Sequence, residues 1–124
     1  MSPPNLLFII TDQQRFDTLA AYGNHRIKMP YLNRLASQSH VFEKTYVTQP
    51  VCAPSRSSIL TGTFPHWNGV IENDIPLKQG VPVLPEMITS GDYFKGYLGR
   101  TGHLKDADRA PSPVLGLQER KIYS

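Results

Sequence analysis

The segment Asn5-Leu-Leu-Phe-Ile-Ile-Thr-Asp12 is a continuous apolar run that ends in a carboxylate. Its residues do not alternate between apolar and polar, so the run predicts a strand that is covered on both faces, as in the parallel sheet of an α/β protein. Ligands of open α/β sheets bind beyond the carboxyl ends of the strands, which is where Asp12 lies. An aspartate at this place can also serve only as a helix cap.

Composition limits the class of protein to which the chain can belong. The chain has 124 residues, of which 40% are hydrophobic and 19% charged, and this excludes a wholly disordered chain. A single cysteine excludes an intramolecular disulfide, and 11 prolines favour many short elements. The 13 basic residues are scattered, so we expect no nucleic-acid partner.

The longest apolar run covers residues 6–10, far below the roughly 18 residues that span a bilayer, so we expect no membrane partner. The same run is a poor signal peptide because no basic residue precedes it and Asp12 follows closely. We therefore expect a cytoplasmic location.

The remaining pattern predicts short helices and strands in alternation. We expect helices over residues 29–37, 55–60 and 84–89, strands over 41–48 and 93–98, and a loop over 64–73. Gly62 is the expected C-cap of the second helix. These elements are typical of the opening of an α/β domain, and residues 105–124, which are polar and have no clear period, could be a disordered tail or a segment foreign to the fold.

The strongest local signal surrounds Cys52. This residue precedes the expected helix start, where backbone N–H groups favour negative charge. Arg56 follows four residues later and can clamp an anion with two hydrogen bonds. Together these features predict an oxyanion site, although a buried structural cysteine beside a helix start is the alternative. The loop of thiol phosphatases is not matched, because it needs an arginine at position 58, where this chain has Ser58.

Taken together, these segments resemble the sulfatase family. The resemblance rests on Cys52-x-Pro-Ser-Arg56 with Leu60-Thr-Gly62, on residues 5–12, 22–24, 29–36 and 46–50, and on their common order and spacing. It implies a partial alkaline-phosphatase-like α/β fold, a mainly parallel sheet flanked by helices. The resemblance fades after residue 106, so it implies that residues 1–106 are the N-terminal portion of the catalytic domain and that residues 107–124 are a disordered or non-native tail.

The resemblance also implies a chemistry. Cys52 would be oxidised to formylglycine by a separate maturation enzyme, and the hydrated aldehyde would attack a sulfate ester. Arg56 would stabilise that group. Asp12, Gln13 and the modified Cys52 would be ligands of a divalent cation, most often Ca²⁺. Many sulfatases have a second aspartate where this chain has Gln13, and branches with the Asp-Gln-Gln sequence include enzymes that use Mn²⁺.

Two further departures bear on function. The family usually has Gly-Lys-x-His-Leu where this chain reads Gly99-Arg-Thr-Gly-His-Leu104, so Arg100 and His103 match its sulfate-binding residues only in part. Sulfatases are also several times longer than 124 residues. We therefore expect the N-terminal part of a sulfuric ester hydrolase, inactive by itself, whose substrate is a sulfated small molecule or glycan. The alternatives are a phosphonate or phosphate ester hydrolase of the same superfamily and a non-catalytic remnant.

Overall fold

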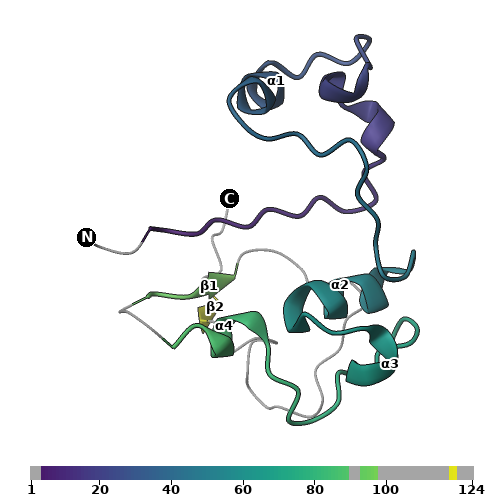
Figure 1. Ribbon diagram of the computed structural model, residues 1–124, viewed down its shortest axis with the longest axis vertical. Coiled ribbons are helices and arrows are strands. Elements are labelled where there is room, and N and C mark those ends of the chain that lie inside the picture. Colours follow the sequence, from purple (N-terminus) through teal and green to yellow (C-terminus); the bar gives the residue numbers. More distant parts are fainter. Residues whose placement is uncertain (1–3, 90–92, 98–117, 120–124) are drawn as a thin grey trace. The chain divides into compact units, whose positions relative to one another are not determined.

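The computed structural model describes residues 4–89, 93–97 and 118–119, and the chain divides into two compact units, Met1–Tyr46 and Val47–Ser124 (Figure 1). Each unit is built from short elements. Those of the first unit are the 3-10 turns η1 (Phe16–Thr18) and η2 (Ala20–Tyr22) and the helix α1 (Pro30–Ser37). Those of the second are α2 (Cys52–Thr61), α3 (Pro65–Asn68), α4 (Leu84–Met87), β1 (Gly96–Tyr97) and β2 (Gln118–Glu119).

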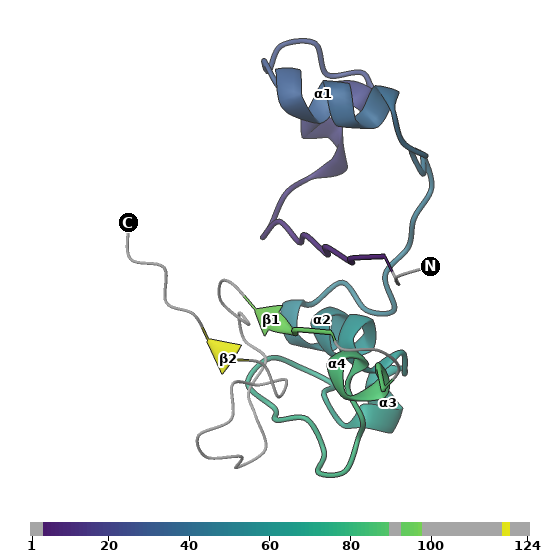
Figure 2. The same ribbon diagram turned by 90° about the vertical axis from the view of Figure 1, so that its left-hand side faces the viewer.

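In the first unit, α1 confirms the helix predicted over residues 29–37. Pro30 occupies the first turn, where its missing N–H costs nothing. Helix α1 contacts η2 within this unit, as Figure 2 shows. The Tyr22 hydroxyl donates a 2.8 Å hydrogen bond to the Phe42 carbonyl, which ties the returning chain to η2.

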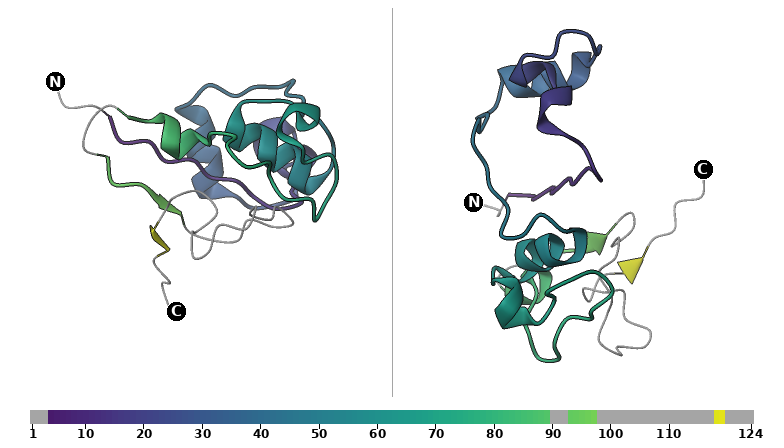
Figure 3. Two further views of the ribbon diagram at one scale, coloured as in Figure 1. Left: turned by 90° about the horizontal axis from the view of Figure 1, so that it is seen from below. Right: turned by 90° about the vertical axis from the view of Figure 1, so that its right-hand side faces the viewer.

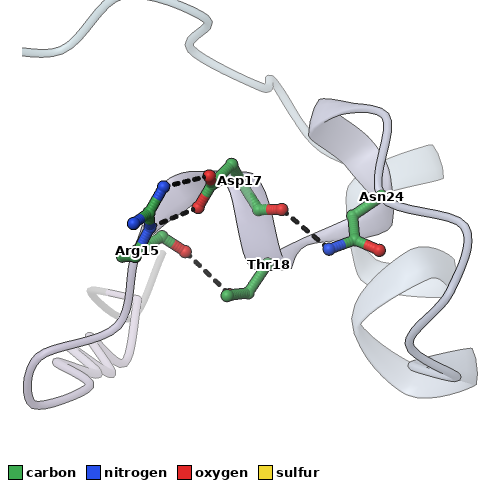
Figure 4. A network of polar contacts seen from close by, with 4 residues as sticks. All are labelled: Arg15, Asp17, Thr18 and Asn24. Atoms are coloured by element: carbon green, nitrogen blue, oxygen red, sulfur yellow. Dashed lines mark hydrogen bonds and ion pairs between the residues drawn. The ribbon is translucent and has the colours of Figure 1, made fainter.

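A polar network fixes the turn that follows the apolar run (Figure 4). The Arg15 guanidinium donates to both carboxylate oxygens of Asp17, at 2.9 and 2.5 Å. The Thr18 hydroxyl donates to the Arg15 carbonyl at 2.7 Å, and Asn24 Nδ2 donates to the Asp17 carbonyl at 2.9 Å. These contacts stabilise η1 and the residues that flank it.

The ion pair predicts a pH response. Hydrogen bonds from Arg15 hold the pKa of Asp17 below its ordinary value of about 3.9. A lowered folded-state pKa stabilises the fold above the unfolded-state pKa, and this contribution is lost as the pH falls through the lowered value. In an NMR titration of the Asp17 carboxyl carbon, we expect a midpoint below the ordinary value. The variant Arg15→Gln should return it to normal, and an unchanged midpoint in that variant would contradict the assignment.

The strands predicted over residues 5–11 and 41–48 are not formed by the described residues. Residues 4–11 have no strand assignment, and the side chains of residues 6–10 are exposed, Leu7 by 82%. The expectation that both faces of this run are covered is therefore wrong for this chain. A strand needs a hydrogen-bonded neighbour, and no described residue pairs with either run.

In the second unit, α2 begins three residues earlier and ends one residue later than the helix predicted over residues 55–60. Pro54 is compatible with the first turn of a helix, so the helix can start at Cys52. Gly62 adopts the left-handed conformation with φ of 68°, and its N–H donates to the Ser58 carbonyl at 2.8 Å. Gly62 is thus the C-cap that the sequence predicts.

The loop predicted over residues 64–73 contains α3, so that prediction is wrong over Pro65–Asn68. The helix has a proline in its first turn and ends at Gly69, whose φ is 91°. Helix α3 lies beside α2 (Figure 3). The small core of this unit contains the buried Ala53 and Val70, with Leu60 and Leu77 against them.

The remaining elements are short. Helix α4 confirms the start of the helix predicted over residues 84–89, and the Val83 N–H donates to Glu86 Oε2 at 3.2 Å. Strand β1 confirms part of the strand predicted over residues 93–98 and pairs in parallel with β2, Gly96 opposite Gln118. The boundary expected at residue 106 lies outside the described residues. No helix in the described part of the chain is both long and apolar enough to cross a bilayer.

Candidate functional site

Cys52 occupies the first position of α2. The preceding residue, Val51, has extended backbone angles and no side-chain cap. The Cys52 thiol forms no disulfide, and its side chain is half-buried. The thiol therefore lies at the positive end of the helix dipole, where developing negative charge is stabilised.

The first turn of α2 is closed by one local and one distant hydrogen bond. The Ser55 N–H donates to the Val51 carbonyl at 3.0 Å. The Ala53 N–H donates to Asn73 Oδ1, also at 3.0 Å. Asn73 was not singled out by sequence reasoning, because capping motifs are local and this residue is twenty positions away. The only signal in the sequence is the apolar Val51 where a capping side chain is usual.

Arg56 follows Cys52 by one helical turn on α2. Residues four apart share a face of a helix, so the structure brings the thiol and the guanidinium to the same side. Arg56 is half-buried. Cys52 and Arg56 thus lie on one helix, four residues apart.

The other predicted site residues lie elsewhere in the chain. Asp12 and Gln13 follow the extended run of the first unit, and Gln13 has a left-handed φ of 48°. Arg100 and His103 lie outside the described residues. Of the predicted site residues, Cys52 and Arg56 therefore share one helix, and Asp12 and Gln13 belong to the other unit.

Within residues 4–89, 93–97 and 118–119, no group of three or more His, Cys, Asp or Glu side chains is close enough to hold a metal ion. The described residues therefore do not make up a metal centre by themselves.

Comparison with known proteins gives a consistent result. The chain is 34% identical over 107 residues to an ulvan-active sulfatase of Formosa agariphila. This match covers 84% of this chain and 21% of that protein. It is 29% identical to an N-acetylglucosamine-6-O-sulfatase of Bacteroides thetaiotaomicron, over 78% of this chain and 17% of that protein. It is also 29% identical to the N-acetylgalactosamine-6-sulfatase of Homo sapiens, over 79% and 21% of the two chains.

The chain thus spans about a fifth of the length of these relatives. No solved structure matches it. The sequence model of the Sulfatase family matches residues 4–113, which is most of the chain and includes Cys52 and Arg56. An alkaline-phosphatase-like α/β fold goes with that family. On this evidence the chain belongs to the sulfatase family.

Proposed function

We propose that the chain is the N-terminal portion of a sulfuric ester hydrolase and carries the precursor of its nucleophile. The observation that carries this proposal is the place of Cys52 at the first position of α2, with Arg56 one turn later, in a chain of this family. The helix N-terminus and the guanidinium both favour the negative charge that develops when a sulfate ester is attacked.

Each site residue then has a role. Cys52 is converted to formylglycine by a maturation enzyme, and the hydrated form supplies the attacking oxygen. Arg56 holds that group and stabilises its charge. Asp12 and Gln13 contribute oxygen ligands to a divalent cation, Ca²⁺ or else Mn²⁺, with the modified Cys52 as a further ligand. Arg100 and His103 contact the sulfate group.

The names of the relatives support the substrate class. They are sulfatases named for ulvan and for sulfated amino sugars, so we infer a sulfated glycan as the substrate of the whole protein. The mainly parallel sheet belongs to that whole protein, because residues 5–11 become a covered strand only when neighbouring strands pair with it.

The test is a mass measurement followed by an assay. In the protein at its natural length, we expect the tryptic peptide of residues 45–56 to have lost one sulfur and two hydrogens and gained one oxygen. That protein should hydrolyse an aryl sulfate, whereas the 124-residue chain should not, because it spans only about a fifth of its relatives. Faster hydrolysis of an aryl phosphonate or phosphate would favour the alternative esterase. Unmodified Cys52 with no turnover would contradict the proposal.

A further inference from the structure

Two carboxamide hydrogen bonds join the chain on either side of Cys52 to one loop. Gln49 Nε2 donates a 2.8 Å hydrogen bond to the Ile71 carbonyl. Two residues further along that loop, Asn73 Oδ1 accepts a 3.0 Å hydrogen bond from the Ala53 N–H. Cys52 thus lies between two attachment points, three residues after one and one residue before the other.

The start of α2 needs this support because it has no cap of its own. The N-cap residue Val51 has no side-chain oxygen, and Pro54 has no N–H to anchor the third helical position. The Ala53 N–H would otherwise lack a protein acceptor. Asn73 therefore replaces the absent local cap.

The loop that carries Asn73 is itself anchored to α3 by hydrogen bonds and to α2 by packing. Asn68 Oδ1 accepts a 3.0 Å hydrogen bond from the Val70 N–H, and its carbonyl accepts one from the Lys78 N–H at 3.1 Å. Val70 is fully buried against Ala53. The position of Asn73 is thus set by the same core that holds the first turn of the helix.

We propose that Asn73 is a positioning residue for the side chain at position 52, with Gln49 as its partner on the other side. This inference rests on the proposed function, because it concerns the same nucleophile. A cysteine or formylglycine has a single side-chain torsion next to the backbone, so its reactive atom is placed by the backbone that these two carboxamides hold. Small errors in the position of a nucleophile lower the rate much more than they lower binding.

The direct test is amide hydrogen exchange in the 124-residue chain. We expect Asn73→Ala to speed exchange at the Ala53 amide about fivefold, as loss of a helix cap predicts. The Gly62 amide at the other end of α2 should change by less than about twofold, since fraying is confined to the first turn. Asn73→Asp keeps the acceptor oxygen and should retain most of the protection. Unchanged exchange at Ala53 in Asn73→Ala would overturn the inference.

The second readout is kinetic and uses the protein at its natural length. Asn73→Ala and Gln49→Ala should each lower kcat about tenfold and change KM by less than about twofold, because they disturb positioning and not binding. The matched control is Asn24→Ala, which removes a carboxamide that binds the Asp17 carbonyl and the Arg26 N–H in the other unit. It should change neither readout.

The two proposals fail in different ways. Faster exchange at Ala53 with an unchanged kcat would overturn the positioning role while the sulfatase proposal stands. If the protein at its natural length, without any substitution, has no sulfatase turnover, the proposed function fails, and exchange at Ala53 then decides the structural claim alone.

Discussion

Replacing Cys52 by alanine is expected to lower kcat towards an aryl sulfate by at least about a thousandfold in the protein at its natural length. Alanine cannot be converted to the aldehyde, so the attacking oxygen is never formed. The helix N-terminus and Arg56 remain in this variant, and their positive charge can still bind the sulfate group, but no nucleophile is present to attack it.

The fold should survive this change. Cys52 is half-buried, forms no disulfide and occupies the first helical position, where alanine is compatible with the helix. Binding of inorganic sulfate should therefore change by less than about threefold. A matched control is Ser58→Ala on the same helix, which removes a 2.8 Å hydrogen bond from the Thr48 hydroxyl and should keep most of the activity.

Two outcomes would contradict the role of Cys52. One is retention of more than about a tenth of kcat in Cys52→Ala, because a covalent nucleophile cannot be lost at so small a cost. The other is loss of kcat to the same degree in Ser58→Ala, which would mean that α2 is merely sensitive to substitution.

Helix ends were predicted well where the signal is local. Pro30 marks the start of α1 and Gly62 the end of α2, because each residue acts through its own backbone angles. The same signals, Pro65 and Gly69, bracket α3, yet the sequence pattern predicts a loop over this four-residue helix. A helix this short has no apolar periodicity to support its end signals.

Strands and the distant cap could not be predicted in the same way. The apolar run over residues 5–11 has the composition of a buried strand, but its hydrogen bonds need a partner that no described residue provides. The hydrogen bond between Ala53 and Asn73 depends on the direction in which the chain leaves α3. No rule based on residue spacing predicts that direction. Sequence does predict that Cys52 and Arg56 lie close together at the start of one helix, because a spacing of four residues is a local relation.

Replacing Asn68 by alanine is expected to destabilise the second unit by about 2–4 kcal/mol. Asn68 is fully buried, and every buried side-chain polar atom of the described residues has a partner. Its Nδ2 donates to Thr61 Oγ1 at 3.3 Å and to the Thr63 carbonyl at 3.4 Å. Its Oδ1 accepts from the Val70 N–H at 3.0 Å.

The cost arises from what the substitution leaves behind. The Val70 N–H would remain buried without an acceptor, and this alone costs about 1–3 kcal/mol, to which the cavity adds its own term. Urea unfolding followed by circular dichroism measures the change. The control is Asn33→Ala on the exposed surface of α1, which should lie within about 0.5 kcal/mol of the parent chain. A loss of less than about 0.5 kcal/mol in Asn68→Ala would show that the network does not hold α2 to α3.

The Asn68 exchange should also act on the start of α2. Asn68 holds Val70, which begins the loop that contains Asn73. Its replacement should therefore weaken the hydrogen bond between the Ala53 N–H and Asn73 as well as the hydrogen bonds of Asn68 itself. Asn68→Ala should therefore speed exchange at the Ala53 amide, and adding Asn73→Ala should speed it little further. Two substitutions that share one physical path are not additive. If the two substitutions have additive effects on exchange at the Ala53 amide, the hydrogen bond from Ala53 to Asn73 does not depend on Asn68, and the two carboxamides stabilise the unit independently.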